Sequence, residues 1–186
     1  GGIANSMART LKHAPNGKLV ASSSRTMKKA EDFAKKYGAE KAFDSWEEMI
    51  KWDGIDAVYV ATPTSVREDI CVAAAKAGKH VIGEKPFASL PSVQRIVKAC
   101  QENDVAFMDG THLSHHPRTA DLQSKLEELV GKRRSMDSVF QFGLKDASNI
   151  RMKPKLEPMG AIGDAGWYNM RLIVDFLNPD IKLDKV

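Results

Sequence analysis

The chain has 186 residues, enough for one domain and part of a second, and its 42% hydrophobic and 28% charged residues are ordinary for a globular protein. The net charge of +4 is scattered along the chain, which is typical of a solvated surface and predicts no nucleic-acid partner. No apolar run is long enough to predict a membrane span.

The two cysteines, Cys71 and Cys100, each lie among apolar or small residues, and no C-x-x-C pair is present. We expect both to be reduced core residues, which predicts a soluble protein in a reducing compartment, either the cytoplasm or an organelle stroma or matrix. The sequence begins with Gly rather than Met, so we expect that an N-terminal segment has been lost, and no targeting peptide is visible.

Helical and strand patterns alternate regularly over the first part of the chain. Strands separated by helices are typical of repeated βαβ units, so we predict an α/β domain with a Rossmann-type parallel sheet and helices on both faces. Apolar residues at helical spacing predict helices over 5–14, 26–38, 44–52, 65–78 and 90–104. Short apolar runs predict strands over 18–24, 40–43, 55–62, 80–84 and 105–111.

The pattern changes after Thr111, and we predict a boundary there between two domains, 1–111 and 112–186. The second segment has one strand with alternating pattern, which is typical of antiparallel pairing, so we predict the beginning of an α/β domain with a mostly antiparallel sheet. The elements predicted in this segment are a helix at 118–131, a strand at 136–144 and a helix at 164–178 capped by Asp164.

The start of the chain, Gly1-Gly2-Ile3-Ala4, leads directly into the first predicted helix. A dinucleotide-binding fold needs small residues between its first strand and first helix, because the backbone approaches the pyrophosphate there and the helix N-terminus faces it. The four residues suit the second half of such a turn, with the first strand missing. The other interpretation is an ordinary loop before a helix.

Roughly twenty residues further on, where an acidic residue would bind the ribose of NAD, the chain has Ser24 and Arg25 and no acid. A guanidinium makes charge-assisted paired bonds to a phosphate such as the 2′-phosphate of NADP. Together with the glycine turn, these residues favour NADP over NAD. The alternative is that Arg25 is only a surface residue at the start of a helix.

The tripeptide Glu84-Lys85-Pro86 follows an apolar run, and Lys85 taken alone is either a catalytic cation or the polar end of a strand. Its context is more specific. The stretch AVYVATPTSVREDICVAAAKAGKHVIGEKP resembles the Gfo/Idh/MocA oxidoreductase family. The resemblance continues through VAFMDGTHLSHHPR and IRMKPKLEPMGAIGDAGWY, and it is closest to the branch with glucose–fructose oxidoreductase, dimeric dihydrodiol dehydrogenase and NADP-dependent xylose dehydrogenase.

This resemblance implies a Rossmann domain followed by an α/β domain with a large, mostly antiparallel sheet that commonly mediates oligomer formation. It implies that Lys85 points at the substrate hydroxyl or carbonyl, that Tyr168 is the general acid/base, and that Asp164 lines the substrate pocket. The chemistry is coherent, because hydride transfer from an alcohol carbon needs a group that takes the hydroxyl proton. A phenol does so at neutral pH only when a cation lies close by.

Other positions follow by analogy with the family. Thr62 and Pro63 are expected to line the nicotinamide side of the cofactor site, and Glu84 either orients the Lys85 ammonium or forms a surface ion pair. Family members often have a His at the position of Arg67, so this chain departs from the pattern there.

Three histidines, His112, His115 and His116, form an H-x-x-H-H pattern. No carboxylate or Cys lies at ligand spacing, and the family uses no metal, so we predict no metal site. Arg118, Arg151 and Lys153 either contact an anionic or polyhydroxylated substrate or are solvated, and we favour the solvated interpretation for each.

We predict an NADP-dependent oxidoreductase that transfers a hydride between the nicotinamide and a small hydroxy or keto substrate of sugar or dihydrodiol type. Relative to the family, the first strand and most of the C-terminal sheet are not in this sequence, so we expect a chain truncated at both ends. We therefore expect a fragment, or a homo-oligomer or subunit of a larger complex that covers the sheet edges. The alternative function is that of a catalytically silent relative acting as a structural or interaction subunit.

Overall fold

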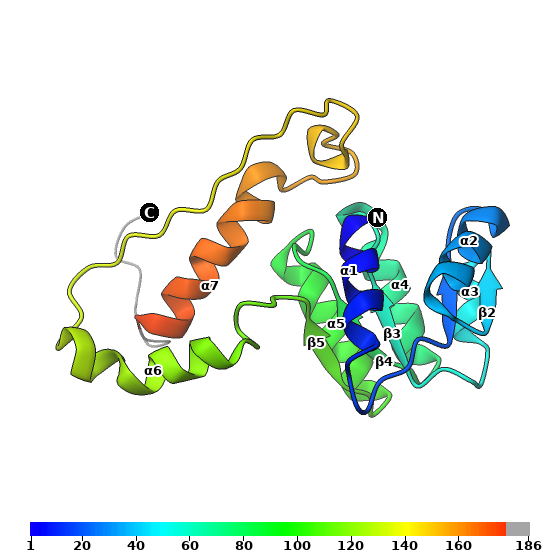
Figure 1. Cartoon of the computed structure of the whole chain (residues 1–186), viewed down its shortest axis with the longest axis horizontal. Coiled ribbons are helices and arrows are strands. Elements are labelled where there is room, and N and C mark those ends of the chain that lie inside the picture. The colour runs from blue at the N-terminus through cyan, green and yellow to red at the C-terminus, as the bar shows by residue number, and fades with distance from the viewer. Residues whose placement is uncertain (178–186) are drawn as a thin grey trace. The chain divides into compact units, whose positions relative to one another are not determined.

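A computed structural model describes residues 1–177, and the chain divides into two compact units, Gly1–Asp109 and Gly110–Val186 (Figure 1). This division lies close to the predicted boundary at Thr111. The assignment of the first part to cofactor binding and of the second to substrate binding stays a prediction. The first unit contains α1 (Gly2–Leu11), β1 (Ala21–Ser23), α2 (Met27–Tyr37), β2 (Lys41–Phe43), α3 (Trp46–Ile50), β3 (Ala57–Val60), α4 (Thr64–Lys76), β4 (His80–Gly83), α5 (Leu90–Glu102) and β5 (Phe107–Asp109). The second contains α6 (Pro117–Val130), the short helices η1 (Ile150–Met152) and η2 (Ile162–Gly166), and α7 (Trp167–Phe176).

The strands of the first unit pair in parallel, which confirms the predicted Rossmann-type α/β fold. They form two groups within the described residues, β1 with β2, and β3 with β4 and β5, in the order β3-β4-β5. The ladder between β3 and β4 pairs Val58 with Val81 and Val60 with Gly83. Because these strands are parallel, their carboxyl ends lie at one edge of the sheet.

Local signals in the sequence determine where the helices begin and end. Ser45 and Ser89 cap α3 and α5, and their hydroxyl oxygens accept hydrogen bonds from the amides of Glu48 and Ser92. Gly38 ends α2 with φ at +79°, a left-handed conformation that glycine adopts without a steric penalty.

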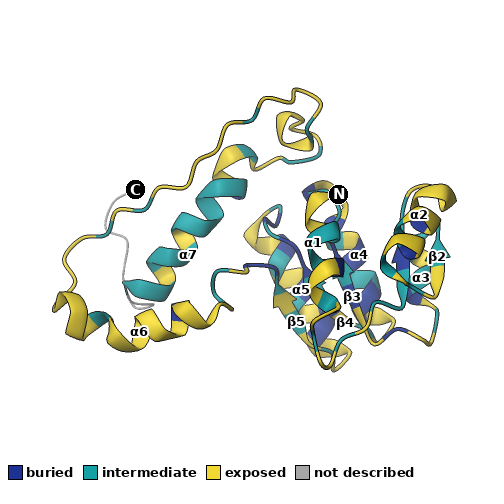
Figure 2. Ribbon diagram, in the orientation of Figure 1, coloured by how far each residue is buried: buried dark blue, intermediate teal, exposed yellow. Residues whose placement is uncertain are grey.

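The core of the first unit lies where β3 and β4 meet α4 and α5. Figure 2 shows the buried residues gathered on these elements. Ala74 and Ala75 of α4 are completely buried, and such small side chains allow α4 and α5 to pack closely. Cys71 is a buried free thiol whose pKa burial raises to about 12, so it is inert at neutral pH. Cys100 is also a buried free thiol, as predicted for a core residue.

The second unit differs from its prediction at two positions. The segment 136–144 was predicted to be a strand, and this is wrong, because it forms no regular element and Val139 is 82% exposed. A strand requires a hydrogen-bonded partner, and no other strand is present between residue 110 and residue 177.

The predicted N-cap of the last helix is also wrong. Asp164 lies inside η2, a π-helical turn, and α7 begins only at Trp167, so Asp164 is part of the helical run rather than its cap. The predicted end of this helix at residue 178 lies outside the described residues. No helix within residues 1–177 is both long and apolar enough to cross a bilayer.

We expect Ile96→Ala to lower the free energy of unfolding by about 2–5 kcal/mol, because Ile96 on α5 is 0% exposed and its removal leaves a cavity. Leu90→Ala on the same helix is the control, since Leu90 is 71% exposed, and should cost less than about 0.5 kcal/mol. Urea unfolding of both variants measures the difference. Equal losses would show that α5 does not pack on the core as described.

Candidate active site

The carboxyl ends of β3 and β4 bring two predicted site residues to the same edge of the sheet. Val60 and Gly83 form the last register pair, and Thr62 and Lys85 each follow two residues beyond it. The two residues therefore occupy equivalent positions on neighbouring strands. Parallel α/β sheets bind ligands at this edge, beyond the carboxyl ends of the strands.

Thr62 has a feature that suits a ligand site. Its hydroxyl oxygen is buried and has no hydrogen-bond partner among the described residues. A buried hydroxyl without a partner is costly, so it marks a position where a polar group of a ligand would be accepted. Pro63 follows as the N-cap of α4, and a proline provides no side-chain hydrogen bond to the helix amides.

Glu84 is buried, at 4% exposure, which rules out the surface ion pair considered for it. The Tyr59 hydroxyl donates a hydrogen bond of 2.5 Å to the carboxylate of Glu84, so Tyr59 supports the site as well as the core. A buried carboxylate requires such donors to offset its lost hydration. The Lys85–Pro86 peptide bond that follows is cis.

The start of α1 also carries residues predicted to bind a cofactor. The first helical bond runs from the Asn5 amide to the Gly1 carbonyl, so the amides of Gly2, Ile3 and Ala4 precede the helical ladder. No side chain caps this helix, and a side chain added at Gly1 or Gly2 would meet nothing within 4 Å. Backbone donors at this turn are therefore accessible to an anion.

Ser24 and Arg25 follow the carboxyl end of β1. The Ser24 amide continues the β1–β2 ladder with a bond of 3.1 Å to the Phe43 carbonyl, while Arg25 is exposed. The position of an exposed guanidinium after this strand is compatible with a 2′-phosphate ligand. The unpartnered Thr62 hydroxyl, the accessible α1 amides and Arg25 together fit a dinucleotide carrying that phosphate.

Arg67 belongs to the first turns of α4 and is 4% exposed. Its guanidinium donates hydrogen bonds to the carbonyl oxygens of Pro86 and Thr62 and to the Thr64 hydroxyl, the last at 3.2 Å. From the sequence, Arg67 is recognisable only as a departure from the family pattern. Its spacing from Thr62 was the available signal, since a long side chain one helical turn into α4 reaches back to the preceding loop.

The second unit contains the other two predicted catalytic residues. Asp164 accepts a hydrogen bond of 2.5 Å from Arg151, and the side chain of Asp164 is only 14% exposed. Asp164 raises the pKa of the Arg151 guanidinium, and Glu157 and Tyr168 act in the same direction more weakly. Arg151 is exposed, as favoured from the sequence, and it also forms an ion pair with Asp164.

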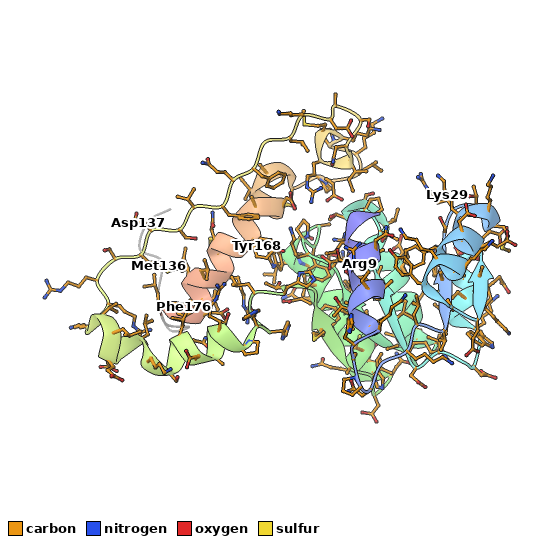
Figure 3. All side chains as sticks on the ribbon, viewed as in Figure 1. Arg9, Lys29, Met136, Asp137, Tyr168 and Phe176 are labelled. Carbon is orange, nitrogen blue, oxygen red and sulfur yellow. The ribbon has the colours of Figure 1, made fainter. Side chains whose placement is uncertain are left out.

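Tyr168 lies in the first turn of α7, one turn beyond Asp164 (Figure 3). Its ring meets Phe140 edge to face, with the ring centroids 5.2 Å apart. Next to it, the Trp167 indole donates a bond of 2.7 Å to the Thr111 hydroxyl, which fixes the start of α7. Lys85 belongs to the first unit and Tyr168 to the second.

The fold is that of an α/β protein, and its candidate site lies at the carboxyl ends of parallel strands, where such proteins bind nucleotides. The family model "Oxidoreductase family, NAD-binding Rossmann fold" (GFO_IDH_MocA) matches residues 1–111, and the chain belongs to this family.

Two relatives and one solved structure illustrate the similarity. The chain is 29% identical over 170 residues to dTDP-3,4-didehydro-2,6-dideoxy-α-D-glucose 3-reductase of Actinomadura kijaniata, covering 90% of this chain and 51% of that protein. It is 32% identical over 151 residues to D-xylose 1-dehydrogenase (NADP⁺) 2 of Haloferax volcanii, covering 80% of this chain and 46% of that protein. A crystal structure of a 3-ketoreductase from Actinomadura kijaniata with NADP and TDP-benzene matches with a TM-score of 0.88 at 28% identity. The match covers 94% of this chain and 54% of that chain. The chain thus spans about half the length of these relatives.

We expect Tyr59→Phe to lower the free energy of unfolding by about 1–3 kcal/mol, because it removes a donor from the buried carboxylate of Glu84. Tyr37→Phe is the matched control, since its hydroxyl donates a bond of the same 2.5 Å length to the neutral amide of Asn5. Tyr37→Phe should lower the free energy of unfolding by less, about 1 kcal/mol at most. Chemical denaturation measures both, and a larger loss for the control would contradict the assigned role of Glu84.

Proposed function

We propose that this chain carries the cofactor half and part of the substrate half of an NADP-dependent oxidoreductase. The reaction is hydride transfer between the nicotinamide and a small hydroxy or keto substrate. The observation that supports it most directly is the strand edge, where the unpartnered buried hydroxyl of Thr62 and the cation of Lys85 follow neighbouring strands. The NADP in the matching ketoreductase structure and the NADP⁺ in the name of the xylose dehydrogenase add support.

In this proposal Gly1 and the backbone amides of Gly2, Ile3 and Ala4 bind the pyrophosphate. Ser24 and Arg25 bind the 2′-phosphate, through a hydroxyl and a guanidinium that suit its oxygens. Thr62 and Pro63 line the nicotinamide side, and Glu84 supports the loop that carries Lys85. When bound, NADP supplies the group that accepts or donates the hydride.

Three side chains divide the remaining chemistry. Tyr168 exchanges a proton with the substrate hydroxyl oxygen, and Lys85 stabilises negative charge on that oxygen and on the phenol. Asp164 lines the substrate pocket, where its ion pair with Arg151 orients the carboxylate. This arrangement gives the carboxylate a binding role rather than the role of a base.

The substrate class we propose is a sugar or a related polyol, including sugars attached to a nucleotide. Its support is the pair of relatives that act on a dTDP-linked sugar and on D-xylose. A homo-oligomer, or a subunit of a larger complex, belongs to this proposal as well.

Arg25→Ala should weaken NADPH binding about 10-fold or more while changing NADH binding less than about 2-fold, because only NADPH has the 2′-phosphate. Lys28→Ala is the control, an exposed cation on α2 outside the proposed site. Fluorescence titration of the folded chain with each cofactor measures both constants. Wild-type protein that is folded but binds neither cofactor would contradict the proposed function and favour the structural-subunit alternative.

Lys85→Met and Tyr168→Phe should each lower kcat for NADP-dependent oxidation of D-xylose at least about 100-fold, since each removes a group needed for proton transfer or charge stabilisation. NADPH affinity should change little in Tyr168→Phe, which separates chemistry from cofactor binding. The assay follows NADPH formation by absorbance. Full turnover by Lys85→Met would refute the proposed chemistry.

A further inference from the structure

Arg67 has an unusual combination of charge and burial in the first unit. The whole residue is 4% exposed, and its partners include two main-chain carbonyl oxygens from different loops. One carbonyl belongs to Thr62, in the loop after β3, and the other to Pro86, in the loop after β4. The guanidinium therefore links the two loops that carry the proposed nicotinamide and catalytic contacts.

Burying a guanidinium is costly unless its donors are satisfied, so a residue that only filled space at this position would be apolar. The planar fork of arginine presents several N–H groups in fixed directions, and here they reach two carbonyls and the Thr64 hydroxyl at once. A lysine ammonium has the same charge, but it is a single point and does not reproduce this fork.

The two carbonyls are directly connected to site residues. The Thr62 carbonyl belongs to the residue whose buried hydroxyl has no partner, and the Pro86 carbonyl lies one residue beyond Lys85. Parallel pairing aligns the strands only as far as Val60 and Gly83. Beyond that pair, the hydrogen bonds from Arg67 to the Thr62 and Pro86 carbonyls join the two loops.

We propose that Arg67 is a positioning residue for the cofactor site, which holds the Thr62 loop and the Lys85 loop at the spacing needed to bind NADP. This inference rests on the proposed function and adds a residue that acts through the backbone of its neighbours. In this proposal Arg67 acts by holding the two loops and not by direct contact with substrate or cofactor.

The first test measures the loops without any ligand. Hydrogen–deuterium exchange is compared for wild type, Arg67→Met and Arg67→Lys, in peptides covering 61–66 and 84–88, with 94–102 in α5 as the reference. Exchange in the two loop peptides should rise at least about 10-fold in both variants, while the reference peptide stays unchanged. Arg95→Met is the matched control, because Arg95 is an arginine at the α4–α5 surface whose exposed ion pair with Glu68 links helices rather than loops.

The second test measures the NADPH dissociation constant of the same proteins at a temperature where each is folded. It should rise about 10-fold or more in both Arg67 variants and less than about 2-fold in Arg95→Met. If charge alone mattered, Arg67→Lys would restore wild-type affinity, and that result would overturn the proposal. Unchanged exchange in both loops would overturn it as well.

The two tests separate the two proposals. If wild-type protein binds no NADPH, the proposed function fails, while loop exchange still decides whether Arg67 joins the loops. If wild type binds NADPH and the Arg67 variants bind it equally well, only the positioning role fails. Should Arg67→Met not fold, the milder Arg67→Lys decides by the same criteria.

Discussion

The parallel ladder between β3 and β4 is the constraint on which the candidate site depends. A parallel register that pairs Val60 with Gly83 brings both carboxyl ends to one level, so the residues that follow emerge side by side at the sheet edge. A shift of one residue would move the loop after β4 relative to the loop after β3 and would exchange the faces of the side chains. The valines buried in both strands oppose such a shift, so packing in the core determines geometry at the edge.

Buried polar groups near this edge hold the loops that follow the two strands. Glu84 receives a hydrogen bond from Tyr59, a residue of the neighbouring strand, while Arg67 joins the two loops from the side of α4. Each of these groups would be unfavourable in the core if it lacked partners. The bond from Tyr59 to Glu84 and the bonds from Arg67 to the two loop carbonyls offset part of this cost, and they leave the loop region fewer accessible arrangements than apolar packing alone would.

Much of the first unit could be predicted from sequence, because its signals are local. Apolar runs, serine caps and Gly38 identify the elements, and alternation of strand and helix implies parallel pairing. The second unit was less predictable. The alternating pattern at 136–144 resembles a strand, but strand formation depends on a partner and not on the pattern alone. The bonds of Arg67 and Arg151 were missed for a related reason, since a single sequence does not show which distant acceptors a long side chain reaches.

The two units also differ in how their polar groups are satisfied, and this bears on the division of the proposed chemistry. In the second unit Asp164 has its cation within the same unit, because Arg151 pairs with it at 2.5 Å. This pairing suits a carboxylate that orients a substrate in the proposed reaction. Tyr168, the general acid/base of that proposal, lies one helical turn away on the same helical run, where the π-helical turn of η2 precedes α7. Such turns alter the direction of the side chains that follow, so the aspartate and the tyrosine owe their relative placement to a local departure from α-helical geometry.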